Sequence, residues 1–208
     1  MFISFEGCEG AGKTTLANYL FHKISQNFSV ILTKEPGGNE NNSNKFNILI
    51  KEMLLTFQDK IDNYTEALLF AADRIEHLKK IIIPALKKKK IVICDRYIDS
   101  SLAYQGYARQ LGEKFIHNIN FFAFKYLPDI TFYLDLEPKI GLKRLKKERK
   151  SKIEYFDLKN INFHKKVRYG YLKLCQKYSK RIHKVDANRS LPEIEKIIES
   201  KINSFLKK

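Results

Sequence analysis

Hydrophobic and polar positions follow two different periods along this chain. Five short runs rich in β-branched and aromatic residues predict strands, at residues 2–6, 29–33, 91–95, 130–135 and 182–186. Apolar residues at helical spacing predict helices between them, at residues 13–26, 44–56, 65–82, 113–126, 138–147 and 160–180. A last helix is expected after Ser190, because Ser190 and Glu193 form a capping-box pattern before an apolar run.

Strands that alternate with helices pair in parallel through right-handed crossovers. The pattern therefore predicts one α/β domain over residues 1–208, with three layers and a five-stranded parallel sheet between helices. Such sheets bind ligands beyond the carboxyl ends of their strands. Glu6, Asp95 and Asp135 are acidic residues that each end a predicted strand. We expect a functional site at this edge of the sheet.

The segment after the first predicted strand, GCEGAGKT at residues 7–14, matches G-x-x-x-x-G-K-[ST] and precedes a predicted helix. Its glycines let backbone N–H groups point at phosphate oxygens. Lys13 would reach the β- and γ-phosphates, and the Thr14 hydroxyl can ligate Mg²⁺. The motif predicts a P-loop NTPase fold that binds ATP or GTP. The residues expected around the nucleotide are Gly7, Cys8, Glu9, Gly10, Ala11, Gly12, Lys13, Thr14 and Thr15.

Charged residues near this loop suggest a second phosphorylated ligand. Glu9 is unusual in an anion-binding loop and is expected to accept a hydrogen bond from a substrate hydroxyl, unless it is a solvated loop acid. Asp95 is placed for Mg²⁺ or its waters and Arg96 for a second phosphate group, although the two could form a simple ion pair. Lys34 ends the second strand and would face the same crevice, or belong to an ordinary loop.

Two further segments offer groups that can recognise a base. Phe70 and Arg74 lie one helical turn apart and can stack on a planar base and bond its carbonyl, unless they are a packed Phe and a surface Arg. Residues 100–106 follow Arg96 closely, so their Ser, Tyr and Gln are expected to border the same pocket or to be only a helix start. The core stripe expected beside Phe70 consists of Leu68, Ala71, Ile75, Leu78 and Ile82.

Composition limits the class of protein without choosing the ligand. The chain is 44% hydrophobic and carries a net charge of +16, from 39 Lys and Arg against 23 Asp and Glu. This excludes wholesale disorder and suggests an anionic partner. Three scattered cysteines argue against a disulfide scaffold or zinc site. We find no targeting segment or apolar run long enough for a membrane span and expect a cytoplasmic protein. Seven of the ten residues at 143–152 are cationic, which predicts a solvated helix end or a mobile basic lid over residues 143–155.

Six blocks of the sequence carry a resemblance to a known family. They are FEGCEGAGKTT (5–15), KEPGG (34–38), LLFAADR (68–74), DRYIDSSLAYQG (95–106), PDITFYLDL (128–136) and FHKKVRYGYLKL (163–174). Together they resemble the thymidylate kinase family of P-loop nucleoside-monophosphate kinases. The P-loop occurs in a vast superfamily, whereas LLFAADR and SSLAYQG are far more particular to this family. The resemblance runs nearly end to end.

The resemblance implies transfer of a phosphoryl group from ATP to dTMP by a direct in-line reaction with Mg²⁺, as a homodimer to which the helix at 65–82 contributes. It implies no nucleic-acid or membrane partner. It assigns Glu9 to the 3′-hydroxyl of dTMP, Phe70 to stacking on thymine and Arg74 to a base carbonyl. The remaining implied roles are the dTMP phosphate for Lys34 and Arg96, the nucleoside pocket for Ser101, Tyr104 and Gln105, the Mg²⁺ shell for Thr14 and Asp95, and catalysis for Lys13, Glu9 and Arg96.

Two positions depart from the family pattern. Lys34 stands where the family has Arg, so a bidentate phosphate clamp becomes a point charge. Members without Arg in the P-loop carry a catalytic Arg in the lid, and here Arg149 or Lys152 is expected in that role.

Three other functions compete with this interpretation. Phe70, Arg74 and Gln105 argue against a nucleotide kinase with a different base preference. A P-loop ATPase acting on nucleic acid needs a helicase-type motif or a separate stacking platform, and we find neither. A GTP-dependent switch needs the N-K-x-D guanine motif, which the chain lacks.

Overall fold

The computed structural model contains one parallel sheet with the strand order β2-β3-β1-β4-β5. It describes residues 1–38, 45–57, 60–148 and 160–206. The strands are β1 (Phe2–Gly7), β2 (Val30–Lys34), β3 (Ile91–Asp95), β4 (Ile130–Asp135) and β5 (Ile182–Asp186). The α-helices are α1 (Lys13–Ile24), α2 (Lys45–Phe57), α3 (Asn63–His77), α4 (Ile83–Lys87), α5 (Ile98–Ser101), α6 (Glu113–Ile119), α7 (Pro138–Glu148), α8 (Ile161–Lys177) and α9 (Leu191–Leu206).

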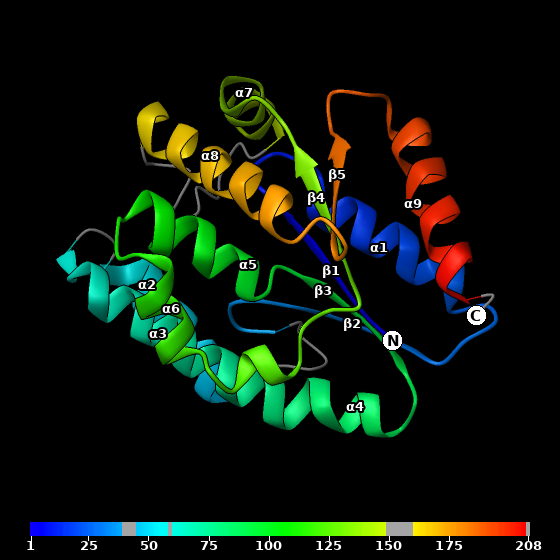
Figure 1. The fold of residues 1–208 in the computed structure, drawn as a ribbon, viewed down its shortest axis with the longest axis horizontal. Coiled ribbons are helices and arrows are strands. Elements are labelled where there is room, and N and C mark those ends of the chain that lie inside the picture. The colour runs from blue at the N-terminus through cyan, green and yellow to red at the C-terminus, as the bar shows by residue number, and fades with distance from the viewer. Residues whose placement is uncertain (39–44, 58–59, 149–159, 207–208) are drawn as a thin grey trace.

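Helices cover both faces of the sheet, as the three-layer prediction requires (Figure 1). Helices α1 and α9 pack on one face, and α5, α8 and the segments joined to them lie on the other. Side chains along each strand alternate between the two layers. In β1, Phe2 belongs to the cluster beneath α8, whereas Ile3 and Phe5 belong to the cluster beneath α1 and α9. Because both faces are buried, the central strands are mostly apolar, with buried polar exceptions such as Ser4, Glu6 and Thr131. All five predicted strands are confirmed within one residue.

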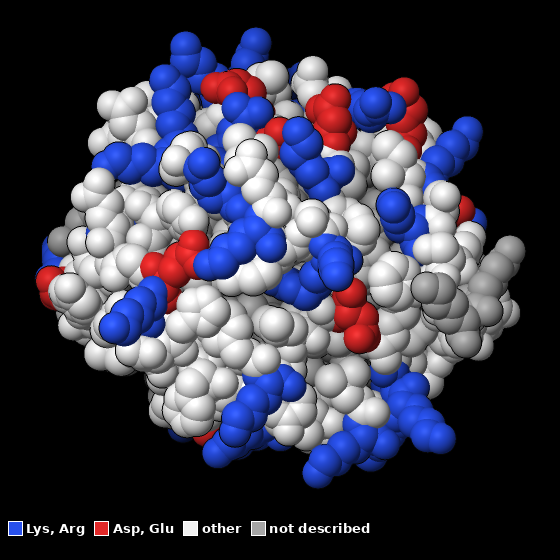
Figure 2. Space-filling view, viewed as in Figure 1, with Lys and Arg blue, Asp and Glu red and all other residues white. Residues whose placement is uncertain are grey.

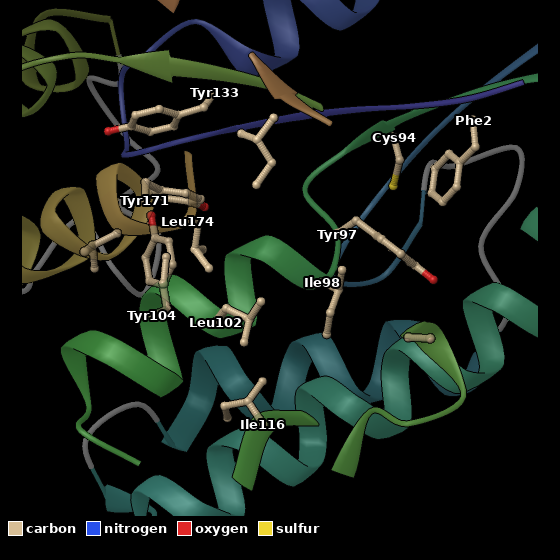
Figure 3. Packing of buried hydrophobic residues seen from close by; sticks show 14 of the residues in the cluster. Phe2, Cys94, Tyr97, Ile98, Leu102, Tyr104, Ile116, Tyr133, Tyr171 and Leu174 are labelled. Atoms are coloured by element: carbon tan, nitrogen blue, oxygen red, sulfur yellow. The ribbon is translucent and has the colours of Figure 1, made fainter. Parts of the chain in front are cut away.

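The cluster beneath α8 is rich in tyrosine (Figure 3). Tyr133 from β4 stacks on Tyr171 from α8 with ring centroids 4.8 Å apart, and Tyr104 meets Tyr171 edge-on at 6.2 Å. These rings supply apolar area while their hydroxyl groups point at polar neighbours. The layer therefore carries hydrogen-bonding groups directly to the carboxyl end of the sheet.

Two predicted helices differ from the structure. The helix expected at 65–82 continues through a π-helical turn, η2 (Leu78–Ile82), into α4, because Pro84 stands in the first turn of α4, where a missing N–H is tolerated. The helix expected at 113–126 ends at Ile119, and only a 3₁₀ turn, η4 (Ala123–Lys125), follows. Asn120 leaves helical geometry, with φ at −119°, and its side-chain amide donates to Ile116 O at 3.0 Å.

One helical element was not predicted. Helix α5 leads directly into a longer π-helical segment, η3 (Leu102–Ala108). A π-helix has a wider turn than an α-helix, so its buried positions do not recur at the spacing used for the prediction. Helix α5 carries Ser101 and η3 carries Tyr104 and Gln105, so the omission concerns the site itself.

One predicted core residue lies on the surface, and the basic side chains are spread over the surface drawn in Figure 2. Leu68 is 51% exposed and does not belong to the core stripe of α3, whereas Leu78 and Ile82 are fully buried. Lys and Arg side chains are scattered over the face drawn in Figure 2 rather than gathered in one band. Within the described part of the chain, no helix is long and apolar enough to cross a membrane.

Two glycines bring α7 against the loop after β1. A Cβ added to Gly10 would lie 2.3 Å from the carbonyl oxygen of Gly141, and one added to Gly141 would lie 2.3 Å from that of Glu9. Both obstacles are backbone atoms, which cannot move aside as a flexible side chain would. Glycine is therefore required on both sides of this contact.

We expect Gly141→Ala to lower the free energy of unfolding by about 1–3 kcal/mol through this overpacking, although alanine favours helix. Urea unfolding followed by circular dichroism measures the change. Lys143→Ala, at an exposed position of the same helix, should alter stability by less than about 0.5 kcal/mol. Equal stability of the two variants would contradict the contact.

Candidate active site

A cavity of about 290 Å³ opens beyond the carboxyl ends of β1, β2 and β3. Most of the residues singled out in the sequence line it, from both the loop after β1 and the opposite wall. These are Glu9, Gly10, Gly12, Lys13, Thr14, Thr15, Lys34, Phe70, Arg74, Arg96, Ser101, Tyr104 and Gln105. Gly7, Cys8 and Ala11 of the same loop do not line it, and Cys8 and Ala11 are buried core residues.

The loop after β1 turns back on itself in a conformation that glycine allows. Gly10 and Gly12 have φ values of 71° and 90°, in the left-handed region that other residues rarely adopt. Lys13 begins α1, and its Nζ donates to Cys8 O at 2.9 Å across the curled loop. Burial lowers the pKa of Lys13, and the nearby charge of Arg96 acts in the same direction. The loop thus presents a buried cation and the start of a helix to the cavity.

Thr14 and Asp95 meet at the edge of this loop and form a suitable set for Mg²⁺. The Thr14 hydroxyl donates to Asp95 Oδ2 at 2.5 Å, and Asp95 Oδ1 is buried without a hydrogen-bond partner in the described residues. A hydroxyl and one carboxylate suit a cation that retains several waters and binds substrate phosphates. The described residues contain no cluster of three or more His, Cys, Asp and Glu arranged for a metal. Asp95 does not pair with Arg96, which rules out that alternative.

Glu9 is the acceptor at the centre of a buried charged cluster. Its Oε1 accepts from Arg96 Nη2 at 2.9 Å and from the Tyr104 hydroxyl at 2.5 Å, and His164 Nδ1 lies 3.2 Å from Oε2. Its side chain is only 9% exposed, so it is not a solvated loop acid. Burial raises the pKa of Glu9, but His164, Arg96 and Lys13 outweigh that effect and hold the pKa well below its usual range. Glu9 is therefore a carboxylate over the whole physiological pH range.

Arg96 is fixed from several directions. Its backbone has φ at 71°, which is uncommon for a residue with a side chain. Its Nη1 donates to Gly7 O at 3.0 Å, and the Ser100 and Tyr171 hydroxyls lie 3.3 and 3.4 Å from the same atom. The guanidinium also lies over the Tyr104 ring, 5.0 Å from its centroid. Its orientation is thus set before any ligand binds.

Arg74 is the largest fully buried side chain of the described protein, not a surface arginine. Its Nε donates to Glu35 Oε2 at 2.8 Å, and its Nη1 donates to Ser101 Oγ at 2.9 Å and to Asn120 Oδ1 at 2.8 Å. The remaining nitrogen, Nη2, lies 2.8 Å from Glu35 Oε2 and 3.4 Å from Tyr97 O. Every nitrogen of the guanidinium has a protein partner, and its flank faces the cavity beside Phe70.

A second buried acid, Glu6, lies directly behind Arg96. It accepts from Tyr97 N at 2.7 Å, Ser100 Oγ at 2.6 Å and the Tyr171 hydroxyl at 2.8 Å. Burial and the negative charge of Asp99 raise the pKa of Glu6 to about 7, although the hydrogen bond from Ser100 opposes them. Glu6 therefore supports Arg96 through the two hydroxyl groups that contact it.

Comparisons with known proteins point to one family. A family model described as thymidylate kinase matches residues 5–198. The chain belongs to the thymidylate kinase family. It is 59% identical to the thymidylate kinase of Onion yellows phytoplasma over 204 residues, which cover 97% of this chain and 96% of that protein. The thymidylate kinase of Acholeplasma laidlawii is 47% identical over 200 residues, covering 95% and 96%. A crystal structure of thymidylate kinase from Ehrlichia chaffeensis superposes with a TM-score of 0.76 at 33% identity, covering 98% of each chain.

Several residues of this thymidylate kinase family site received no role in the sequence analysis. His164 from α8 contacts Glu9, Glu35 holds Arg74, and Glu66 from α3 accepts from Gln105. Glu35 and His164 lie within the blocks at 34–38 and 163–174 that carry the resemblance, but the partner of each of the three residues lies far away along the chain. Asp135, which ends β4, faces Arg168 of α8 at 2.7 Å and does not line the cavity. Arg149 and Lys152 lie outside the described residues.

The raised pKa of Glu6 predicts a pH dependence of stability. Between its usual value of 4.5 and about 7, folded Glu6 keeps a proton that the unfolded chain has released. The contribution of Glu6 to the unfolding free energy is therefore largest below pH 4.5 and falls as the pH rises through 7. Glu6→Gln cannot ionise, so the stability of wild type minus that of the variant should fall between pH 5 and pH 8 in urea titrations. The exposed Glu52→Gln should give a difference that is flat with pH, and a flat difference for Glu6→Gln would contradict the raised pKa.

Proposed function

We propose that this protein transfers the γ-phosphoryl group of ATP to dTMP, producing ADP and dTDP. Family membership supports the reaction, and one structural observation carries it for this chain. A single cavity joins the phosphate-binding loop to a wall that holds an aromatic ring and directional hydrogen-bonding groups, which suits a donor triphosphate and a nucleoside monophosphate bound face to face.

The phosphate donor occupies the loop side of the cavity. Backbone N–H groups of the loop residues that line the cavity, 9–10 and 12–15, surround its phosphates. Lys13 leaves Cys8 O to contact the β- and γ-phosphates. Mg²⁺ would be held by Thr14 and Asp95 and, when bound, would neutralise charge on the phosphoryl oxygens. The buried and unpaired Asp95 Oδ1 supports this assignment.

The acceptor dTMP occupies the opposite wall. Its phosphate lies between Lys34 and Arg96, and its 3′-hydroxyl donates to Glu9, whose carboxylate Arg96, Tyr104 and His164 hold in place. Phe70 stacks on the base. A contact from Arg74 to a base carbonyl requires release of one present partner, and Tyr97 O at 3.4 Å is the most distant. Ser101, Tyr104 and Gln105 complete the nucleoside pocket.

Catalysis follows from position and charge. The phosphate oxygen of dTMP attacks the γ-phosphorus in line, and no covalent enzyme intermediate forms. The loose transition state of phosphoryl transfer needs charge neutralisation more than a strong base. Lys13 and Arg96 supply it from fixed positions. Arg149 or Lys152 remains our proposal for the cation contributed by the lid.

The direct test is release of ADP with a panel of nucleoside monophosphates. We expect kcat/KM for dTMP to exceed those for AMP, GMP and UMP by about 100-fold or more, because unmatched polar groups in the pocket are left unpaired. Lys13→Ala should remove activity at unchanged melting temperature and so excludes a contaminating kinase. Equal rates with dTMP and any of the other three would reject the proposed substrate.

We further propose that the protein acts as a homodimer through α2 and α3. Helices α2 and α3 lie side by side (Figure 1). Apolar side chains on both helices are exposed at helical spacing. They are Phe46, Leu49, Met53 and Phe57 on α2, and Tyr64 and Leu68 on α3, each 44–52% exposed. A continuous apolar stripe of this kind marks an interaction surface, and a second copy covers it symmetrically.

Met53→Glu combined with Leu68→Glu should convert the dimer to a monomer, since two charges would be buried in an apolar interface. Light scattering coupled to size-exclusion chromatography measures the mass of each species. Leu191→Glu, at an exposed apolar position on α9, should leave the mass unchanged. A monomeric wild type at micromolar concentration would disprove the dimer.

A further inference from the structure

Glu66 is a buried acid that contacts Gln105 of the proposed nucleoside pocket, and it has no role in the proposed reaction. It lies in the first turn of α3 and is 1% exposed. Its Oε1 accepts from Gln105 Nε2 at 2.8 Å, and its Oε2 accepts from Arg109 Nη2 at 2.7 Å. Glu66 does not line the cavity, whereas Gln105 does. One carboxylate therefore connects α3 to the polar wall carried by η3.

The charge on Glu66 fixes which end of the Gln105 amide faces the cavity. A carboxylate paired with an arginine is ionised and only accepts hydrogen bonds. The amide nitrogen of Gln105 must then face Glu66, and the oxygen must point the other way. Gln105 Oε1 makes no hydrogen bond within the described residues. It is also not one of their fully buried polar atoms without a partner, so some of its surface is accessible. It is therefore reached from the cavity and presents an acceptor there.

We propose that Glu66 is a positioning residue that sets base specificity by holding Gln105 with its carbonyl oxygen toward the base. This inference rests on the proposed function and deepens it. Thymine carries an N–H donor at N3, which matches an acceptor on the protein. Cytosine carries an unprotonated N3, so the same pose would bring two acceptors together in a desolvated pocket, which is unfavourable.

Gln105 alone does not provide this discrimination. The two ends of an amide have nearly the same shape, so an unrestrained glutamine can turn over and offer its NH₂ group instead. With Glu66 in place, such a turn would bring the amide oxygen against a buried carboxylate. Specificity for an N–H donor thus depends on a charge that does not contact the nucleotide.

Glu66→Gln tests the inference, because it keeps the shape of the side chain but gives Gln105 a partner that both donates and accepts. We expect the ratio of kcat/KM for dTMP to that for dCMP to fall by about tenfold or more. The ratio for dTMP to dUMP should stay unchanged, because uracil carries the same N3–H donor and differs only in its methyl group. A general loss of structure would lower all three values and leave the ratios alone.

Glu76→Gln is the matched control, since Glu76 lies on the same helix, is 28% exposed and pairs with Lys80. Both ratios should equal those of the wild type. If Glu66→Gln folds cooperatively and keeps the wild-type ratio of dTMP to dCMP, the inference is wrong.

A measurement on the wild type covers the case in which Glu66→Gln does not fold. Nuclear Overhauser contacts from the Gln105 side-chain amide protons to Glu66 are expected both without nucleotide and with dTMP bound. Contacts from those protons to the thymine ring instead would overturn the inference. If the wild type prefers another monophosphate, the proposed function fails, whereas the amide orientation is still read in the absence of nucleotide.

Discussion

The site depends on keeping charged groups ionised where the fold buries them. At the carboxyl ends of β1 and β3, Glu9 and Arg96 are 9% and 19% exposed, and an unpaired charge at such a position costs several kcal/mol. Each charge is therefore compensated by the other and by hydroxyl, imidazole and carbonyl groups around them. Such a cluster is stable only as a whole, because removal of one member leaves its partner buried and unpaired. This explains how Arg96 keeps an uncommon backbone conformation.

Side chains anchored in the hydrophobic layer supply some of the groups that compensate these charges. Tyr171 belongs to the core, where it stacks on Tyr133 (Figure 3). Its hydroxyl reaches both Glu6 and Arg96. Helix α8 thus cannot shift on the sheet without disturbing the charged cluster. His164 lies about two helical turns before Tyr171 on α8 and joins the same helix to Glu9. Packing energy and site geometry are coupled through these two side chains, since the residues that anchor α8 also orient the acceptor and the cation that face the cavity.

Local patterns in the sequence account for much of the fold. The strands and the loop at residues 7–14 were predicted because their signals, apolar runs and a glycine motif, lie within a few consecutive residues. The π-helical segment with Tyr104 and Gln105 is not predicted by the apolar spacing, because its turn has a different period. The sequence leaves open whether Arg74 lies on the surface, because no local pattern indicates that an arginine is buried. Its burial depends on Glu35 and Asn120, which lie 39 and 46 residues away along the chain.

The two ends of the cavity meet different physical demands, and the net charge of +16 explains neither of them. A phosphate is recognised mainly by charge, so in the proposed function Lys34 can bind it as a point charge, without the bidentate geometry of an arginine. A neutral base is recognised by the directions of its hydrogen bonds, so the donors and acceptors that bind it must be held in fixed orientations. At that end the protein uses buried acids, with Glu35 behind Arg74 and Glu66 behind Gln105. The Lys and Arg side chains scattered over the face drawn in Figure 2 are not part of this arrangement. In this chain a few acids lie behind the residues that line the cavity and hold the hydrogen-bonding groups of those residues in fixed orientations.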